Sequence, residues 1–530
     1  MPTHSQHSRW FIAFLLFTAI LCGALIMVVE VLGSRVIGPF FGVSLFIWTS
    51  LIAVTMISLA LGYAVGGWLS DRYGEAHNLY AIILLAGLAV LWIPILKAPV
   101  LQFCVPLGLR LGSFVSTTLL FGPSLFLLGF VSPYLVRIAA RELNSLGRTV
   151  GSFYAISTLG SVAGTALTGF VLIAWMGVDR IFQVVGLLLV LLGAGYLLAT
   201  RHYRGLWPLL LLPLLLWMQP RQELPRVTMA NGTQAELVAS VDSHYGSVKV
   251  VDYSFGAKRV RELLIDGLVQ GGVDASNGES VYEYPYFLQL LPWAMNPKME
   301  TALVIGMGAG VIPRWFDQQG VVTDVVDIDP VIYRMAREYF GATPRGEWYV
   351  EDARYFLTQS PKQYDLVVMD VFTGDTTPAH LLSVEALGLI EKRLGERGML
   401  AINLAGELHR DTYMSASVIK TLRQVFEQVE IYPTFSPGPE LSFGNLAVIA
   451  YQGPPRPLDK ERLNRFSVHP MAREGVQANL GRRFEFPSGT PAIVLTDDYN
   501  PIDFFDSETR EGVREIIINS TPWEILIYSG

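Results

Sequence analysis

The sequence predicts a multi-pass α-helical membrane domain followed by an α/β domain with a small β-rich lead-in. The 530 residues have a mean hydropathy of +0.40, with 51% hydrophobic and only 16% charged residues, and are therefore more apolar than a soluble protein of this length. Long apolar runs fill the first two-fifths of the chain, and short alternating runs replace them from about residue 226. We expect a transmembrane domain over 1–220, a β-rich segment over 226–295 and the α/β domain proper over 296–530.

Six apolar runs approach or exceed the roughly 20 residues that cross a bilayer as a helix. A seventh run, LWPLLLLPLLLWM at 206–218, has 13 residues and two prolines, so it is either a short span, a re-entrant piece or an interfacial helix. The domain therefore has six or seven spans. The six long runs lie near residues 10–29, 43–69, 79–96, 112–136, 150–174 and 181–199.

The first apolar run is too long for the core of a signal peptide, and no small-residue cleavage site follows it, so we expect an uncleaved anchor. The glycines of GSVAGTALTG (160–169) are expected to be places where neighbouring helices pack closely, as small residues usually are in membranes.

Charge separates the two parts of the chain. Residues 1–219 hold 11 Lys/Arg and 5 Asp/Glu, and the remainder holds 28 and 41, so the net charges are about +6 and −13. The excess of arginine in alternate loops places the N-terminus in the cytoplasm. The two sets are Arg9, Arg72, Arg137, Arg141, Arg148, Arg201 and Arg204 on one side, and Arg35, Lys97, Arg110 and Arg180 on the other.

The number of spans decides where the acidic part lies. With six spans it is cytoplasmic, and with seven it is outside the cell. We favour the cytoplasm, because nucleotide cofactors are supplied there, and expect a multi-pass protein of the inner cell membrane. No basic patch predicts a nucleic-acid partner.

After residue 226 the pattern changes to short elements. HYGSVKVVDY (244–253) and KRVRELLIDGLVQGG (258–272) predict strands joined by hairpins. Beyond them strands alternate with helices, which predicts a doubly wound, Rossmann-like sheet. The expected strands are 301–305, 322–327, 365–370 and 398–404, and the expected helices are 310–318, 330–339, 383–394 and 412–427.

A glycine-rich turn follows the first of these strands in TALVIGMGAG. Gly306, Gly308 and Gly310 lack a Cβ, so their backbone N–H groups can approach a ligand closely. The spacing is G-x-G-x-G rather than G-x-G-x-x-G, which counts against a dinucleotide pyrophosphate site. Asp327 ends the next strand, where a carboxylate can accept both hydroxyls of a ribose.

Two further carboxylates follow strands. Asp352, in YVEDARYFL, could meet an adenine amino group, and Asp370 ends YDLVVMD. Open α/β sheets bind ligands at the carboxyl ends of their strands, so these positions indicate a nucleotide site. Without a ligand, such carboxylates would be helix N-caps or loop caps. His380 and His409 are isolated, so no metal is expected.

The stretch from DSHYGSVKV (242–250) through LLIDGLVQ, VIGMGAG, VDIDP and EDARYFL to YDLVVMDVFTGDTTPAHLL (364–382) resembles spermidine synthases. These are polyamine aminopropyltransferases with a fold of the AdoMet-methyltransferase type. The segment EVLGSRVIGPFFGVSLFIW (30–48) resembles multi-pass membrane segments fused to such a domain. The resemblance implies decarboxylated AdoMet or AdoMet as co-substrate, a small-molecule amine or other acceptor, and a lipid bilayer as partner. It also allows a homodimer.

The resemblance assigns roles to individual residues. Gly306, Gly308 and Gly310 match the nucleotide-binding glycine loop, Asp327 the ribose-binding acid and Asp352 the adenine-binding acid. Asp370 matches the catalytic aspartate and Asp375 the second aspartate of the loop that follows it. Positions near the amine are Gln270, Tyr282 and the acidic Glu283, with Phe435 where the family has a tyrosine.

Departures from the family pattern keep other functions open. Ala309 stands where the family has an aspartate that holds a cationic amine, and Gly278-Glu279 stands for an Asp-Glu pair. One alternative is an AdoMet-dependent methyltransferase or another AdoMet-consuming enzyme, which Ala309 favours because it leaves room for the methionine carboxylate. The other is a transporter or sensor with a regulatory nucleotide-binding domain. For a transferase, Asp370 would bind the amine and accept its proton during an in-line displacement at the sulfonium.

Overall fold

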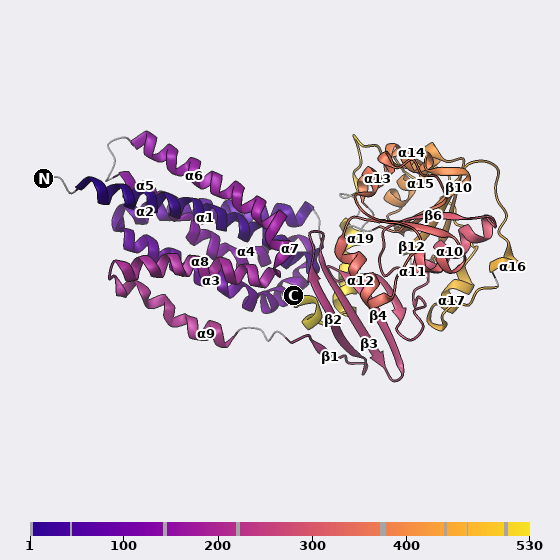
Figure 1. Cartoon of the computed structure of the whole chain (residues 1–530), viewed down its shortest axis with the longest axis horizontal. Coiled ribbons are helices and arrows are strands. Elements are labelled where there is room, and N and C mark those ends of the chain that lie inside the picture. Colours follow the sequence, from indigo (N-terminus) through magenta and orange to yellow (C-terminus); the bar gives the residue numbers. More distant parts are fainter. Residues whose placement is uncertain are drawn as a thin grey trace. The chain divides into compact units, whose positions relative to one another are not determined.

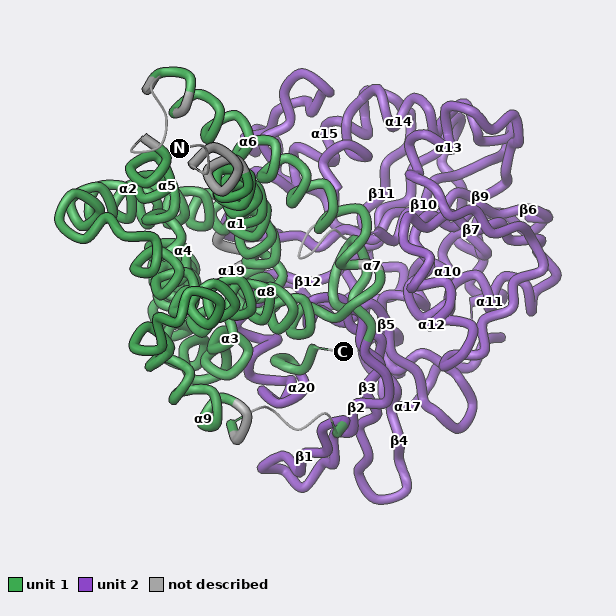
Figure 2. The backbone as a smooth tube through the Cα atoms, turned by 60° about the vertical axis from the view of Figure 1, so that its left-hand side comes forward, with its two compact units in different colours: residues 1–223, 241–247, 526–530 green, residues 224–240, 248–525 purple. Residues whose placement is uncertain are grey.

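The structure, a computed structural model, describes residues 4–42, 45–140, 146–218, 223–371, 378–438, 442–463, 465–502 and 507–529. It divides into two compact units (Figure 2). Unit 1 comprises residues 1–223, 241–247 and 526–530, and unit 2 comprises residues 224–240 and 248–525.

Unit 1 consists mainly of long helices that lie side by side (Figure 1). They are α1 (His4–Phe41), α2 (Leu45–Tyr73), α3 (Ala76–Cys104), η1 (Val105–Leu107), α4 (Gly108–Gly129), α5 (Val131–Ala140), α6 (Leu146–Leu167), η2 (Thr168–Leu172), α7 (Ile173–Trp175), α8 (Val178–Ala199), η3 (Tyr203–Leu211) and α9 (Leu212–Trp217).

Five described helical stretches are long and apolar enough to cross a membrane, against six expected. The difference arises in the third, Ala76–Ala139, whose 64 residues contain two of the expected spans. That stretch is too long for one crossing. Gly108 has a φ of 78° between α3 and α4, and these two helices pack against each other, so the chain reverses direction here. The five are Trp10–Phe41, Phe46–Tyr73, Ala76–Ala139, Val150–Leu172 and Val178–Ala199.

The short run at 206–218 is helical but unusual. Its first part, η3, is a 3₁₀ helix, and α9 continues it. A 3₁₀ helix rises about 2.0 Å per residue and an α-helix about 1.5 Å, so η3 and α9 together reach roughly 27 Å, close to the roughly 30 Å of a hydrocarbon core. This length includes Tyr203, Arg204 and Gly205, which precede the apolar run. The length alone therefore leaves both the six-span and the seven-span topology open.

Lys97 is not a loop residue, contrary to the sequence analysis. It lies inside α3 with 5% of its surface exposed, and its Nζ donates to Asp179 Oδ2 at 2.6 Å and to Ser529 Oγ at 2.8 Å. A buried charge in an apolar helix needs such partners. Because Asp179 neutralises it, Lys97 adds nothing to the loop-charge comparison that oriented the helices.

Glycines bring α1 and α6 into backbone contact, as expected for small residues in a membrane. A Cβ at Gly160 would lie 2.1 Å from the carbonyl oxygen of Ile20, and one at Gly164 would lie 2.3 Å from that of Ala24. Gly151 and Gly169 have no heavy atom within 4 Å of such a Cβ. The close-packing interpretation is therefore confirmed for two of the three glycines in 160–169.

Gly160→Ala is expected to destabilise unit 1, since the methyl group meets backbone rather than a movable side chain and α1 must shift away. The loss should appear as a lower melting temperature of the detergent-solubilised chain, corresponding to about 1–3 kcal/mol for overpacking. Gly151→Ala, on the same helix, is the matched control and should leave the melting temperature unchanged. Equal effects of the two variants would contradict the contact.

Unit 2 begins with a five-stranded sheet in the order β1-β2-β3-β4-β5. Asp266 (φ 47°) and Gly267 (φ 83°) form the two-residue turn between β4 and β5, where Ile265 pairs with Leu268. Asp-Gly is a favoured sequence for this left-handed hairpin turn. The strands are β1 (Arg226–Thr228), β2 (Gln234–Asp242), β3 (Ser247–Phe255), β4 (Lys258–Ile265) and β5 (Leu268–Asp274).

The second sheet has seven strands in the order β11-β12-β10-β9-β6-β7-β8. The run from β10 to β8 is parallel, whereas β12 is antiparallel to both β10 and β11. The predicted α/β fold with its β-rich lead-in is confirmed, and the antiparallel pair makes the sheet mixed. The strands are β6 (Thr301–Ile305), β7 (Val322–Asp327), β8 (Trp348–Val350), β9 (Tyr364–Met369), β10 (Leu394–Glu407), β11 (Gln428–Pro433) and β12 (Phe443–Tyr451).

Helices cover both faces of this sheet (Figure 1). One face packs its apolar side chains against α13, α14 and α15 in a single core cluster, and α10, α11 and α12 lie on the other face. The helices are α10 (Tyr284–Met295), α11 (Val311–Gln318), α12 (Pro330–Phe340), α13 (Ala353–Gln359), η4 (Ala379–Leu381), α14 (Val384–Glu391), α15 (Tyr413–Val425), α16 (Lys460–Leu463), α17 (Pro470–Asn479), α19 (Ser507–Ser520) and α20 (Trp523–Ile527).

Candidate nucleotide and transfer site

The candidate site lies at the carboxyl edge of the parallel strands. β6 runs into the glycine loop, β7 ends in Asp327 and β9 is followed by Asp370. Because β9, β6 and β7 are neighbours in the sheet, these three groups lie next to one another. This is the edge at which open α/β sheets bind ligands.

Each glycine of the loop is required by its surroundings. Gly306, Gly308 and Gly310 have φ values of 91°, 48° and 70°, in the region that favours glycine. A Cβ at Gly306 would lie 2.1 Å from the carbonyl oxygen of Asp370, and one at Gly308 would lie 2.7 Å from that of Gln270. The loop is therefore pressed between the end of β9 and β5. Its assignment to nucleotide binding stays a prediction.

Asp327 ties the glycine loop to β7. Its Oδ2 accepts from the backbone N–H of Met307 at 2.8 Å, and its Oδ1 accepts from that of Asp329 at 2.9 Å. Removal of water raises the pKa of Asp327 to about 6, although the two N–H donors act in the opposite direction. A carboxylate offers about four acceptor positions, so after these two bonds it can still accept two hydroxyls of a ribose.

Asp370 lies half-buried beside Asn403, a residue that the sequence analysis missed. Asn403 Nδ2 donates to Asp370 Oδ1 at 2.8 Å. Removal of water raises the pKa of Asp370 to about 6, and the bond from Asn403 acts in the opposite direction. At neutral pH the carboxylate is therefore ionised but weakly stabilised, which suits a group that accepts a proton. The sequence feature that could have indicated Asn403 was a polar residue between apolar neighbours in AINLAG.

Tyr284 is a second residue that the sequence analysis missed. Its hydroxyl donates to the carbonyl oxygen of Gln270 at 3.4 Å, and burial and the Asp370 carboxylate both raise its pKa. The backbone carbonyl of Gln270 therefore contacts both the glycine loop, at Gly308, and the hydroxyl of Tyr284. The available signal was a second tyrosine in VYEYPYF, but the sequence alone does not tell which of its three tyrosines lies near Asp370.

Tyr282 and Glu283 point elsewhere. The Tyr282 hydroxyl donates to the carboxylate of Glu262 on β4, and burial raises the pKa of that carboxyl. Glu283 precedes α10, and its side chain lies against Gly475 of α17. The contacts in the described part of the chain join neither side chain to Asp370, and their role in substrate binding stays a prediction.

Asp352 caps a helix. Its Oδ1 accepts from the backbone N–H of Tyr355 at 3.0 Å at the start of α13, and its Oδ2 lies 3.4 Å from His380 Nε2. This is the capping role that the sequence analysis held open. An adenine amino group would have to share Oδ2 with His380.

Asp375 and Phe435 are the remaining predicted residues. Asp375 lies outside the described residues. Phe435 follows β11 and packs against Gly444 and the core cluster. Within the described ranges, no group of three or more His, Cys, Asp or Glu side chains is arranged to hold a metal ion.

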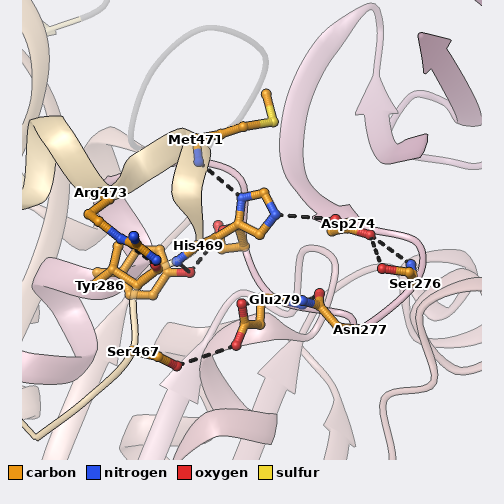
Figure 3. A network of polar contacts seen from close by, with 11 residues as sticks. Asp274, Ser276, Asn277, Glu279, Tyr286, Ser467, His469, Met471 and Arg473 are labelled. Atoms are coloured by element: carbon orange, nitrogen blue, oxygen red, sulfur yellow. Dashed lines mark hydrogen bonds and ion pairs between the residues drawn. The ribbon is translucent and has the colours of Figure 1, made fainter. Parts of the chain in front are cut away.

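A polar network fixes the segment that carries Gln270 and Tyr284 (Figure 3). His469, at the start of α17, lies with its Nε2 3.2 Å from Asp274 Oδ2 at the end of β5. The hydroxyl of Tyr286 accepts from the backbone N–H of His469 at 3.1 Å. Because Nδ1 of His469 accepts from Met471 N–H, Nε2 carries the ring proton and donates to Asp274. The network thus clamps both β5 and the start of α10 to α17.

The glycine loop and sheet order define an α/β fold of the AdoMet-dependent transferase type. Residues 282–450 match the family described as the spermine/spermidine synthase domain. Polyamine aminopropyltransferase 2 from Pseudomonas aeruginosa is 31% identical over 198 residues, 35% of this chain and 55% of that protein. An N-terminal histidine N-methyltransferase from Emericella nidulans is 37% identical over 136 residues, 25% of this chain and 24% of that protein.

A probable spermidine synthase from Corynebacterium glutamicum aligns with a TM-score of 0.38 and 19% identity, over 53% of this chain and 94% of that one. The chain spans 24% of the methyltransferase and 55% of the Pseudomonas aminopropyltransferase, less than two thirds of either. The match of residues 282–450 to the spermine/spermidine synthase domain agrees with the resemblance found in the sequence.

Asp370→Asn is expected to stabilise the chain at neutral pH. The pKa of Asp370 lies above its ordinary 3.8, so the folded state binds the proton more tightly, and stability falls as the pH rises to about 6. Replacing the carboxylate by a neutral amide removes this loss, and the partly exposed position suggests a gain of about 1–2 kcal/mol. Thermal melting should show a higher melting temperature than wild type at pH 8 and no difference near pH 4. A lower melting temperature at pH 8 would contradict the assigned environment.

Proposed function

We propose that the chain is a membrane-anchored, spermidine synthase-like transferase that moves an aminopropyl group from decarboxylated AdoMet to an amine acceptor. The observation that carries the proposal is the carboxylate of Asp370, bonded by Asn403 and placed beside the glycine loop and the strand-end Asp327. The synthase domain at 282–450 and the polyamine aminopropyltransferase relatives support it.

In the proposed reaction the lone pair of a neutral amine attacks the aminopropyl carbon attached to the sulfonium. The carbon–sulfur bond breaks, its electron pair stays on sulfur, and methylthioadenosine leaves. An attacking amine has a pKa near 10 and is protonated in water, so the site must first bind the cation and take up its proton. Asp370 would bind that cation, and its raised pKa would help it to accept or relay the proton as the bond forms.

Methyl transfer from AdoMet is the second candidate, favoured by one contact. Ala309 is 3% exposed, and a Cβ added at Gly271 of β5 would lie 3.0 Å from the Cβ of Ala309, so the methyl group of Ala309 faces this glycine. The position therefore carries no carboxylate that could hold a cationic amine. The relative named as an N-terminal histidine N-methyltransferase agrees with this candidate.

The leaving nucleoside distinguishes the two candidates. Purified chain is incubated with decarboxylated AdoMet or AdoMet and a panel of amines, and the products are identified by mass spectrometry. Aminopropyl transfer predicts methylthioadenosine, and methyl transfer predicts S-adenosylhomocysteine. Asp370→Asn should lower the rate of product formation by about 10²–10⁴-fold, the usual contribution of a general base. Turnover unaffected by Asp370→Asn would contradict the role of Asp370, and binding without turnover would favour a regulatory domain.

We further propose that unit 1 is embedded in lipid and that the transferase domain faces the cytoplasm. Large apolar side chains lie exposed on unit 1, among them Trp10 (80%), Phe170 (81%) and Trp175 (84%). Such exposure is costly in water, and tryptophan is enriched at membrane interfaces. The cytoplasmic placement rests on six spans and on the supply of AdoMet.

Cysteine labelling tests the topology. Cys22 and Cys104 are both buried, so background reaction is low. Phe255→Cys places a thiol at a position that is 62% exposed in unit 2. A membrane-impermeant maleimide should label this variant only after cells are lysed. Labelling of intact cells would place the domain outside and make 206–218 a seventh span.

A further inference from the structure

The hydrogen bond between Asn403 and Asp370 is built into the sheet. Asn403 is 2% exposed, and its neighbour Ile402 pairs with Met369 of β9, so Asn403 lies beside Asp370 in the parallel register. On the other side, Asn403 pairs with Ala447 of β12. A strand hydrogen-bonded on both sides has little freedom, and a buried amide on it holds a fixed position.

The side chains of Asn403 and Asp370 lie on the same face of the seven-stranded sheet, the face that α10 covers. Ile402, Leu404 and Met369 all belong to the core cluster under α13, α14 and α15. Because side chains alternate along a strand, Asn403 points to the opposite face, and Asp370, one position after Met369, meets it there. Asn403 is therefore a buried polar residue whose described side-chain bond goes to the candidate catalytic carboxylate.

We propose that Asn403 is a positioning residue: it holds Oδ1 of Asp370, keeps the carboxylate ionised, and leaves Oδ2 for the attacking amine. This inference rests on the proposed function and deepens it. Asn403 does not touch the substrate and acts through Asp370. Loss of a donor to a half-buried carboxylate is expected to cost more than loss of a hydrogen bond between neutral groups, because the charge is only partly hydrated and the donor is not fully replaced by water.

Other ionisable groups near Asp370 are few in the described part of the chain. From α10, Tyr284 is a phenol that stays neutral, since burial and Asp370 raise its pKa. At the end of β7, Asp327 is engaged by the backbone N–H groups of Met307 and Asp329. The glycine loop brings no ionisable side chain, and Asp375 lies outside the described residues. Asn403 is thus the donor that opposes the effect of burial on Asp370.

Asn403→Leu tests the inference through the pH dependence of turnover. The expected result is a roughly 10–100-fold lower kcat at pH 7, in line with the loss of a hydrogen bond to a charged group. The acidic limb of the profile should move to higher pH, while KM for the sulfonium nucleoside changes less than twofold. Asn296→Leu is the matched control, because Asn296 is also 2% exposed. It lies between α10 and the start of β6, at the edge of the sheet opposite to Asp370. It should leave the pH profile unshifted.

A second experiment measures stability instead of turnover, so it tests the role of Asn403 even if the proposed function is wrong. Melting temperatures at pH 5 and pH 8 are compared for wild type, Asn403→Leu, Asp370→Asn and the double variant. The loss caused by Asn403→Leu should be larger at pH 8, where Asp370 is charged, and the pH difference should vanish when residue 370 is Asn.

The outcomes are distinct. A shifted pH profile, or a pH-dependent coupling between the two positions, supports the positioning role. An unshifted profile, or a loss of stability from Asn403→Leu that is equal at both pH values, overturns it. If no sulfonium donor is turned over at all, the proposed function fails and the melting comparison alone decides on Asn403.

Discussion

The contact between Gly306 and the carbonyl oxygen of Asp370 is the constraint on which the candidate site depends. It allows the loop after β6 to pass directly over the end of β9. The same loop meets the carbonyl of Gln270 at Gly308, and the carboxylate of Asp327 at the N–H of Met307. One short turn thus joins β9, β5 and β7, and brings the predicted nucleotide side and transfer side of the site together.

Ala309, in the same loop, departs from the family pattern on the proposed acceptor side. Its side chain is 3% exposed and faces Gly271 of β5. A transferase without a carboxylate at this position would have two ways to keep an anionic charge near the reacting centre. Either the acceptor is held by Asp370 and its loop, or the co-substrate brings its own carboxylate, as AdoMet does.

Much of the fold was predictable because it depends on local patterns. Apolar runs bounded by glycine and aspartate predicted β6, β7, β9 and β10 to within a few residues, and the long apolar helices were equally clear. Five described stretches stand against six expected spans only because the helices of Ala76–Ala139 follow one another without a break and count as one stretch. Lys97 was misplaced because its partners, Asp179 and Ser529, are distant in the sequence.

The site was predictable only where its residues follow local patterns in the sequence. Asp327 and Asp370 follow strands and could be read from the chain, but Asn403 and Tyr284 act through tertiary contacts that no spacing reveals. For Asp352 the sequence could not decide between two roles, because an aspartate that caps a helix and one that binds a ligand look alike in sequence.

Nucleotide binding tests the central claim most directly. Purified chain is titrated calorimetrically with AdoMet, decarboxylated AdoMet and methylthioadenosine, alongside Asp327→Asn and Asp365→Asn. Asp365 is the matched control, because its carboxylate also accepts from backbone N–H groups, those of Glu300 and Thr301, at the opposite edge of the sheet. We predict that at least one of these nucleosides binds to wild type and Asp365→Asn, and at least about tenfold more weakly to Asp327→Asn, as expected for a lost bond to a charged group. Absence of binding, or equal binding to both variants, would contradict a nucleotide site at this edge.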